Sequence, residues 1–164
     1  TKKKKLPIVF NIFGKENKKN FFLKKETTNT EFLKKKINNL GLDKIVKLMG
    51  QTDNPHVEIL KSDILIRPSR RNDNWGRDII EAMSSGKFII STGDEDFFVK
   101  NQVNGLVFNK WNIKEVVKTL DIYIRNKKKF YAIRKNALKF AKINFNDKKN
   151  SEKAKKLFLE VINK

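Results

Sequence analysis

Short apolar runs alternate with amphipathic helical patterns along most of this chain, and this alternation restricts the fold more than any other feature. We expect strands at residues 8–13, 45–49, 64–66, 88–91 and 106–108. These runs are largely apolar throughout, as is typical of strands that are buried on both faces of a parallel sheet. The pattern therefore predicts an α/β fold, Rossmann-like, with helices on both faces of a parallel sheet.

Helix start and stop signals lie between the expected strands. Thr28 and Glu31 resemble a capping box that opens the first helix, and Gly41 ends this helix. A later helix runs from Gly76 to Gly86. The chain after the last strand is helical by pattern, and its final apolar face consists of Ala154, Leu157, Phe158, Val161 and Ile162.

Charge and composition narrow the function classes. The chain has 164 residues, with 38 Lys and Arg against 18 Asp and Glu, so its formal net charge is +20. This charge favours anionic partners such as nucleic acid, acidic lipid or a phosphorylated ligand. Cysteine is absent and His56 is the single histidine, which excludes disulfide scaffolds, thiolate zinc sites, thiol nucleophiles and imidazole clusters.

Neither a membrane span nor a signal peptide is expected from the sequence. No apolar run approaches the ~20 residues that a membrane span needs. The apolar stretch after the lysines at 2–5 is too short for a signal peptide. We therefore expect a cytoplasmic protein.

The segment after the third expected strand carries the candidate chemistry, because ligands of such sheets bind beyond the carboxyl ends of the strands. Residues 68–76 run from a strand end into a helix start, where Gly76 allows close approach of a ligand. The unpaired amides and the positive dipole end of that first helical turn favour a phosphate. Asp73 and Glu81 flank the turn, and their carboxylates suit the vicinal hydroxyls of a ribose or hexose. From spacing alone, both acids could equally be solvated or ion-paired surface residues, and Trp75 could be a packing residue.

Several short motifs occur in one order along this region. They are Pro68-Ser69, Asp73 to Gly76, Ile80-Glu81-Ala82-Met83, Gly86 and Asn104-Gly105. This order resembles the group 1 (GT4-type) retaining glycosyltransferases with the GT-B fold, in which a PS dipeptide, an acidic residue, an aromatic-glycine pair, EAM and a later NG follow one another. The resemblance implies that residues 1–164 are one nucleotide-sugar-binding domain, the C-terminal half of a two-domain enzyme.

The resemblance also implies roles for individual residues. Glu81 aligns with the family glutamate that holds the ribose of the sugar nucleotide, and Asp73 falls where the first acid of an E-x7-E pair contacts the donor sugar. Trp75, Gly76 and Arg77 lie where backbone amides meet the sugar and pyrophosphate. The catalytic candidates are therefore Asp73 and Glu81, and the donor-binding candidates are Trp75, Gly76, Arg77 and Glu81. No metal or other cofactor is expected, because helix amides and basic side chains stabilise the departing diphosphate.

Three departures from the family pattern stand out. Asp73 is one methylene shorter than the usual glutamate, and the segment 92–96 replaces two adjacent glycines and a glutamate. The chain also has one strand before its first helix where the family has two. We equate residues 8–13 with the second family strand, so that the first strand-helix unit is missing or lies upstream. In the alternative, they are the first strand, and Lys15 and Lys18 become phosphate-binding candidates.

The implied function is binding of a nucleotide-diphosphate sugar for retaining glycosyl transfer in surface polysaccharide or lipid-linked glycan synthesis. The implied partners are the sugar nucleotide and an N-terminal acceptor-binding domain, so the isolated chain is expected to bind donor without turnover. We also expect weak peripheral contact with the anionic inner face of the membrane. The lysines that would make it are Lys127, Lys128, Lys129, Lys148, Lys149, Lys153, Lys155 and Lys156.

Two alternatives remain open at this stage. A basic nucleic-acid-binding module has only the charge in its favour, because the sequence carries no RNP-like, zinc or helix-turn-helix signature. A catalytically degenerate GT-B domain is the second, and it is motivated by Asp73 and by the altered loop at 93–96.

Overall fold

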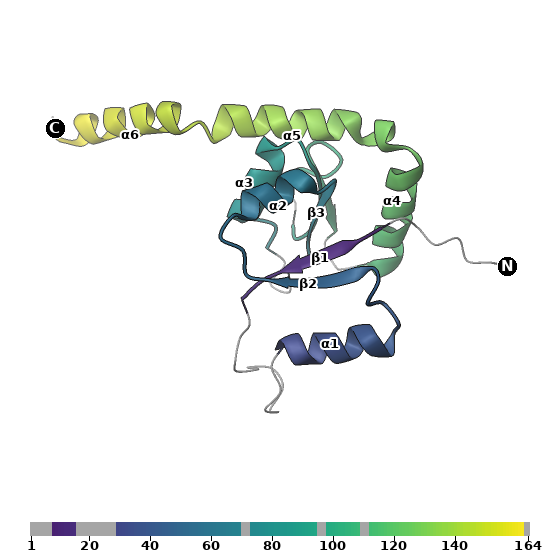
Figure 1. Ribbon diagram of the computed structural model, residues 1–164. Helices are drawn as coiled ribbons and strands as arrows, with labels where there is room; N and C mark the ends of the chain where they lie inside the picture. The colour runs from purple at the N-terminus through teal and green to yellow at the C-terminus, as the bar shows by residue number, and fades with distance from the viewer. Residues whose placement is uncertain (1–7, 16–28, 70–72, 95–97, 109–111, 163–164) are drawn as a thin grey trace. The chain divides into compact units, whose positions relative to one another are not determined.

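The protein is described by a computed structural model that covers residues 8–15, 29–69, 73–94, 98–108 and 112–162. Within it the chain forms two compact units, residues 1–54 and residues 55–164 (Figure 1).

The first unit is a two-stranded parallel sheet with one helix. It contains β1 (Phe10–Phe13), α1 (Asn29–Asn39) and β2 (Val46–Gly50). Phe10 pairs with Val46, and the register shifts between Ile12 and Phe13.

The second unit is built on a parallel sheet with the order β3-β4-β5. Its elements are α2 (Pro55–Lys61), β3 (Ile64–Arg67), α3 (Arg77–Ser84), β4 (Phe88–Thr92), β5 (Leu106–Phe108), α4 (Ile113–Arg125), η1 (Lys127–Phe130), α5 (Tyr131–Asn144) and α6 (Asp147–Ile162). Ile66 lies beside Ile90, which lies beside Leu106. The five strands expected from the sequence are confirmed, with ends that differ by one or two residues.

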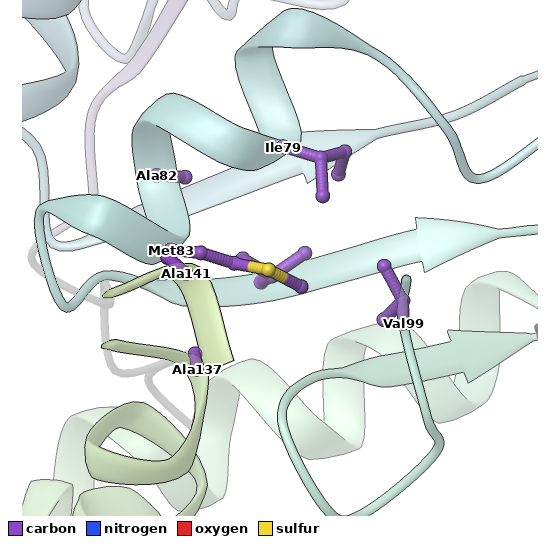
Figure 2. Packing of buried hydrophobic residues seen from close by; sticks show 7 residues of the cluster. Ile79, Ala82, Met83, Val99, Ala137 and Ala141 are labelled. Atoms are coloured by element: carbon purple, nitrogen blue, oxygen red, sulfur yellow. The ribbon is translucent and has the colours of Figure 1, made fainter. Parts of the chain in front are cut away.

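Helices cover both faces of the central strand β4, whose five residues are all buried. Ile89 points to one face and joins a cluster with Ile79 and Met83 of α3 and Ala137 of α5 (Figure 2). Phe88 must point to the opposite face, because side chains alternate along a strand.

On that opposite face Phe88 stacks on Tyr123 of α4 at 5.0 Å between ring centroids, and Phe130 of η1 lies 4.6 Å away. Full burial of each large apolar side chain contributes roughly 1.5–3 kcal/mol. The expected α/β fold with helices on both faces of a parallel sheet is therefore confirmed.

Gly86 follows the C-terminal end of α3 and stops the helix, as the sequence indicated. Its φ of +61° is left-handed, a conformation that favours glycine. The Lys87 amide donates to the Ala82 carbonyl at 2.9 Å, and the Gly86 amide donates to the Met83 carbonyl at 3.0 Å. This is a Schellman arrangement, and it leads α3 directly into β4.

The last helix, α6, contains no buried residue. Its predicted apolar face is exposed: Leu157, Phe158, Val161 and Ile162 are 63%, 69%, 73% and 75% accessible. The sequence pattern thus identified the apolar face of α6. Among the described residues of this unit, no other element covers that face. In the part of the chain that the structure describes, no helix is both long and apolar enough to span a bilayer.

Candidate functional site

Asp73, Trp75 and Gly76 lie in the loop that leaves the carboxyl edge of the second sheet, and Arg77 and Glu81 lie in the helix that follows it. Because β3, β4 and β5 are parallel, they all end at this edge, and the segments that follow β3 and β4 meet there. Thr92, the last residue of β4, accepts a hydrogen bond at Oγ1 from the Ser69 amide at 2.6 Å and donates one to the Ser69 carbonyl at 2.9 Å. The loop that leaves β3 is therefore fastened to the end of β4.

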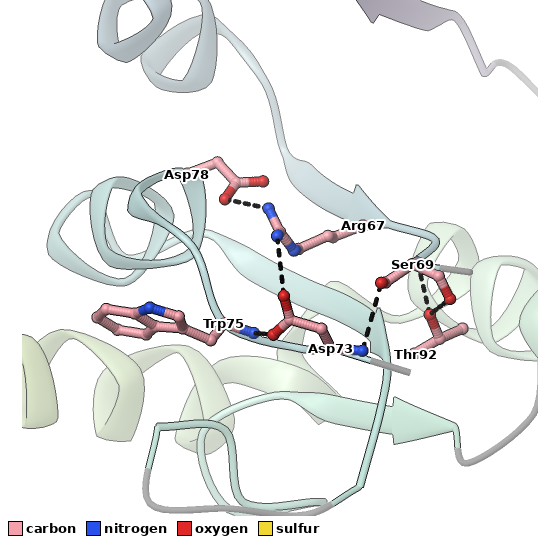
Figure 3. Close-up of polar contacts among 6 residues, drawn as sticks. All are labelled: Arg67, Ser69, Asp73, Trp75, Asp78 and Thr92. Atoms are coloured by element: carbon pink, nitrogen blue, oxygen red, sulfur yellow. Dashed lines mark hydrogen bonds and ion pairs between the residues drawn. The ribbon is translucent and has the colours of Figure 1, made fainter. Parts of the chain in front are cut away.

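Asp73 organises the backbone of that loop. Its Oδ1 accepts a hydrogen bond from the Trp75 amide at 2.9 Å, which is an Asx turn. Its own amide donates to Ser69 Oγ at 3.3 Å, and its Oδ2 lies 3.9 Å from Arg67 Nη2 (Figure 3). About half of the Asp73 side chain, 51%, is exposed to solvent. Asp73 is thus both a structural residue of the loop and an accessible carboxylate.

The turn at Gly76 starts α3 without a side-chain cap. The first amides of a helix have no partner inside the helix, so they and the positive dipole end are available to an anion. A Cβ on Gly76 would lie 2.5 Å from Arg67 Nη1 and 2.8 Å from Arg67 Cζ. The Arg67 guanidinium therefore packs against the turn, and a larger residue at position 76 would have to displace it.

Glu81 lies in the second turn of α3 and has a different partner from Asp73. Its Oε1 is 3.4 Å from Nε of Arg77. The Glu81 side chain is 23% exposed, whereas the Arg77 side chain is 84% exposed. The two predicted acids are therefore held separately, Asp73 by the loop and Glu81 by the helix.

Trp75 packs on one side and is open on the other. Its ring centroid lies 3.7 Å from that of Phe98 and 6.2 Å from that of Phe145, in tilted arrangements. The residue is still 40% exposed. Trp75 is therefore a packing residue that also leaves part of its ring accessible at the site.

Two side chains of the site were missed by the sequence analysis. Asn74 is 2% exposed, and its Nδ2 donates to the Asp94 carbonyl at 2.6 Å, which joins the loop before α3 to the loop after β4. Arg67 forms an ion pair with Asp78 at 2.6 Å between Nη1 and Oδ1. One signal did exist: Arg67 is the charged residue at the carboxyl end of an otherwise apolar strand.

Asn104 of the Asn-Gly motif is a structural residue. It is 3% exposed. Its Oδ1 accepts from the Lys100 amide at 2.7 Å, and its Nδ2 donates to the Phe98 carbonyl at 2.9 Å. The motif closes the turn that leads into β5.

Some sequence expectations lie elsewhere. Lys18, Glu95 and Asp96 fall outside the described residues. Lys15 follows β1 in the first unit and is exposed. Its alternative role in phosphate binding stays a prediction.

Comparison with known protein families gives a match. The family of glycosyl transferases group 1 matches residues 1–140. A search among curated proteins found no match.

The solved structures that resemble this fold include those of HepE, LpcC and a sucrose-phosphate synthase. HepE from Anabaena, in complex with UDP-glucose, is 26% identical with a TM-score of 0.69 over 78% of this chain and 36% of its own. The C-terminal domain of the group 1 glycosyl transferase LpcC from Francisella tularensis is 23% identical, with a TM-score of 0.61 over 72% of this chain and 63% of its own. Sucrose-phosphate synthase from Thermosynechococcus elongatus is 17% identical, with a TM-score of 0.74 over 93% of this chain and 38% of its own. The chain thus spans about a third of HepE.

Proposed function

Because the chain belongs to the glycosyl transferases of group 1, whose pattern matches residues 1–140, we propose that it binds the nucleotide-sugar donor of a retaining glycosyl transfer. The observation that carries the proposal is the uncapped start of α3 at the carboxyl edge of a parallel sheet, with Asp73 and Glu81 on either side of it. An anion at this turn meets backbone amides and a helix dipole. HepE, which is similar over 78% of this chain, was solved with UDP-glucose.

The proposal assigns a part of the donor to each candidate residue. The amides of Gly76 and Arg77 bind the diphosphate and the adjoining sugar. The Trp75 amide is held by Asp73 Oδ1 at 2.9 Å, so Trp75 contributes the exposed part of its side chain instead. Glu81 accepts hydrogen bonds from the ribose hydroxyls, and its 23% exposed side chain is consistent with a carboxylate that faces a partly dry site. Asp73, which is more exposed, contacts the donor sugar.

The chemistry of these groups is electrostatic. Negative charge develops on the diphosphate as the glycosidic bond to the anomeric carbon breaks. Fixed amides at a helix start stabilise that charge without reorganising. The exposed Arg77 guanidinium can exchange its 3.4 Å pair with Glu81 for the diphosphate. The proposal includes no metal ion.

The acceptor belongs to a part of the enzyme that this chain does not encode. The chain spans 36% of HepE, and a transfer needs donor and acceptor held together. We therefore propose that these residues alone bind donor without forming product. A role in surface polysaccharide or lipid-linked glycan synthesis, in the cytoplasm, completes the proposal.

A lipid surface is a second proposed partner, and α6 is the observation that favours it. The helix exposes Leu157, Phe158, Val161 and Ile162 on one face. Its lysines are Lys148, Lys149, Lys153, Lys155 and Lys156. A helix with an apolar face and a lysine-rich polar face binds in the headgroup region of anionic membranes. We therefore propose that the apolar face of α6 adds to the weak membrane contact expected from the lysines.

The experiment that tests the proposed function is a binding screen with UDP, GDP, ADP and their sugars, followed by ligand-observed NMR. Saturable binding of a sugar nucleotide supports the proposal. Binding of random DNA with a steep salt dependence, and no response to any nucleotide, supports the nucleic-acid alternative instead. A degenerate domain would bind donor but give no product even with its acceptor-binding part restored.

A further inference from the structure

Arg67 faces two carboxylates from different parts of the site. Its Nη1 donates to Asp78 Oδ1, in the first turn of α3, at 2.6 Å. Its Nη2 lies 3.9 Å from Oδ2 of Asp73 in the loop (Figure 3). A single guanidinium at the end of β3 therefore connects the loop and the helix start. A planar fork with several donors suits this geometry, and a lysine ammonium does not.

The Arg67 guanidinium is partly buried, because its side chain is 28% exposed. It packs against Gly76, where a Cβ would lie 2.5 Å from Nη1. Arg67 is the register partner of Ser91, which is fully buried. Neither Arg67 Nε nor Ser91 Oγ has a hydrogen-bond partner among the described residues. Interactions of a partly buried charge are stronger than those of an exposed one, because water screens them less.

The two carboxylate oxygens of Asp73 face different groups. Its Oδ1 is held by the Trp75 amide at 2.9 Å, and its Oδ2 is turned toward Arg67. Glu81 has no such connection, since its partner is Arg77 at 3.4 Å. Arg67 is therefore paired with Asp73, the residue assigned to the donor sugar, whereas Glu81, the residue assigned to the ribose, is paired with Arg77.

We propose that Arg67 is a positioning residue that holds the Asp73 carboxylate and the Trp75–Gly76 backbone in place before the donor arrives, and so sets the preference for a sugar nucleotide over the bare nucleotide. The assignment of the sugar to Asp73 rests on the proposed function. The preorganised loop itself does not, because the contacts of Arg67 exist without any ligand. The two parts can therefore be tested separately.

Three variants of the chain test the proposal. Arg67→Met removes the charge and keeps the length, and Arg67→Lys keeps the charge without the fork. Arg125→Met is the matched control, because it removes an arginine that makes a 2.9 Å ion pair with Asp121 on α4, away from the loop. Calorimetry measures the affinity of each variant for UDP-glucose and for UDP. Amide hydrogen exchange of the ligand-free chains measures the order of the loop at Trp75.

Arg67→Met is expected to weaken UDP-glucose about tenfold more than UDP, as loss of a charge-assisted contact implies. Arg67→Lys is expected to lose less of the preference for UDP-glucose over UDP than Arg67→Met does. Arg125→Met is expected to leave this preference unchanged. Equal weakening of both ligands, or an unchanged ratio in a folded Arg67→Met chain, overturns the proposal. If the parent chain binds neither UDP nor UDP-glucose, the proposed function fails, and hydrogen exchange decides on Arg67. Faster exchange of the Trp75 amide in Arg67→Met then supports the positioning of the loop, and unchanged exchange overturns it.

Discussion

Thr92 and Ser69 share two hydrogen bonds at the carboxyl edge of the sheet, one in each direction between the Thr92 hydroxyl and the Ser69 backbone. Thr92 is 2% exposed. The two bonds attach the loop that leaves β3 to the end of β4. The loop of the candidate site is therefore anchored to the sheet.

Thr92→Val tests this connection. Valine has nearly the same shape but leaves the Ser69 amide and carbonyl without their partner, so we expect a loss of about 1–3 kcal/mol in the free energy of unfolding. Thr92→Ser, which keeps the hydroxyl, is the control and is expected to lose much less. Denaturant unfolding followed by circular dichroism gives both values. A stability of Thr92→Val equal to that of the parent chain would show that the two hydrogen bonds of the hydroxyl do not stabilise the fold.

Glu81→Gln is expected to weaken binding of UDP and UDP-glucose together, because both contain the ribose. Loss of a charged hydrogen-bond acceptor costs on the order of 1.5–3 kcal/mol. The matched control is Glu58→Gln, which removes the charge of another helical glutamate that pairs with a neighbouring lysine, Lys61, at 2.8 Å. Calorimetry on the two variants separates the site from the general effect of charge. Unchanged affinity in Glu81→Gln removes this residue from the site.

Asp73 should affect the sugar more than the nucleotide. Asp73→Asn keeps an oxygen that can accept from the Trp75 amide, whereas Asp73→Ala removes the turn contact as well. Both variants are expected to lose the preference for UDP-glucose over UDP, and the asparagine variant should retain its affinity for UDP. Comparison of the two ligands by calorimetry checks this. The assigned role is wrong if both ligands weaken equally in Asp73→Asn.

The sequence was sufficient to predict the strands, the helix between Gly76 and Gly86 and the loop that carries the site. Those features follow from local periodicity, from glycine at a helix end and from the common edge of parallel strands. The contact of Arg67 with Asp78 was not predictable, because it joins residues 11 positions apart on different elements. It depends on how closely the guanidinium approaches Gly76, which is a matter of tertiary packing.

The exposure of α6 is a second feature that periodicity leaves open. A helical pattern identifies which residues share a face, and Phe158 and Ile162 do so. It does not tell whether another surface covers that face. In this unit they remain 69% and 75% exposed.

Co-sedimentation with lipid vesicles tests the proposed contact of α6 with an anionic surface. We expect more binding to vesicles with acidic lipid than to neutral ones, and less at physiological than at low salt, because each lysine near the leaflet contributes about 1 kcal/mol. Phe158→Ser should reduce binding. Ile113→Ser, which removes an apolar side chain of α4 with a similar exposure of 64%, should not.

Two outcomes would contradict the membrane contact. If equal amounts of protein sediment with neutral and acidic vesicles, the lysines do not bind the anionic surface and only add to the general surface charge. Equal effects of the two serine variants mean that α6 does not insert, and its apolar face would then fit another part of a longer polypeptide.

Binding of a sugar nucleotide at the start of α3 can be followed by amide chemical-shift mapping during titration with UDP-glucose. We expect saturable shifts concentrated on Trp75, Gly76, Arg77 and Asp78. At Asp73 we expect a smaller shift with UDP than with UDP-glucose. Saturation without those shifts places the ligand elsewhere. No shift with any nucleotide sugar, together with salt-dependent shifts across the lysine-rich surface on addition of random DNA, would show that the domain binds nucleic acid and not a sugar nucleotide.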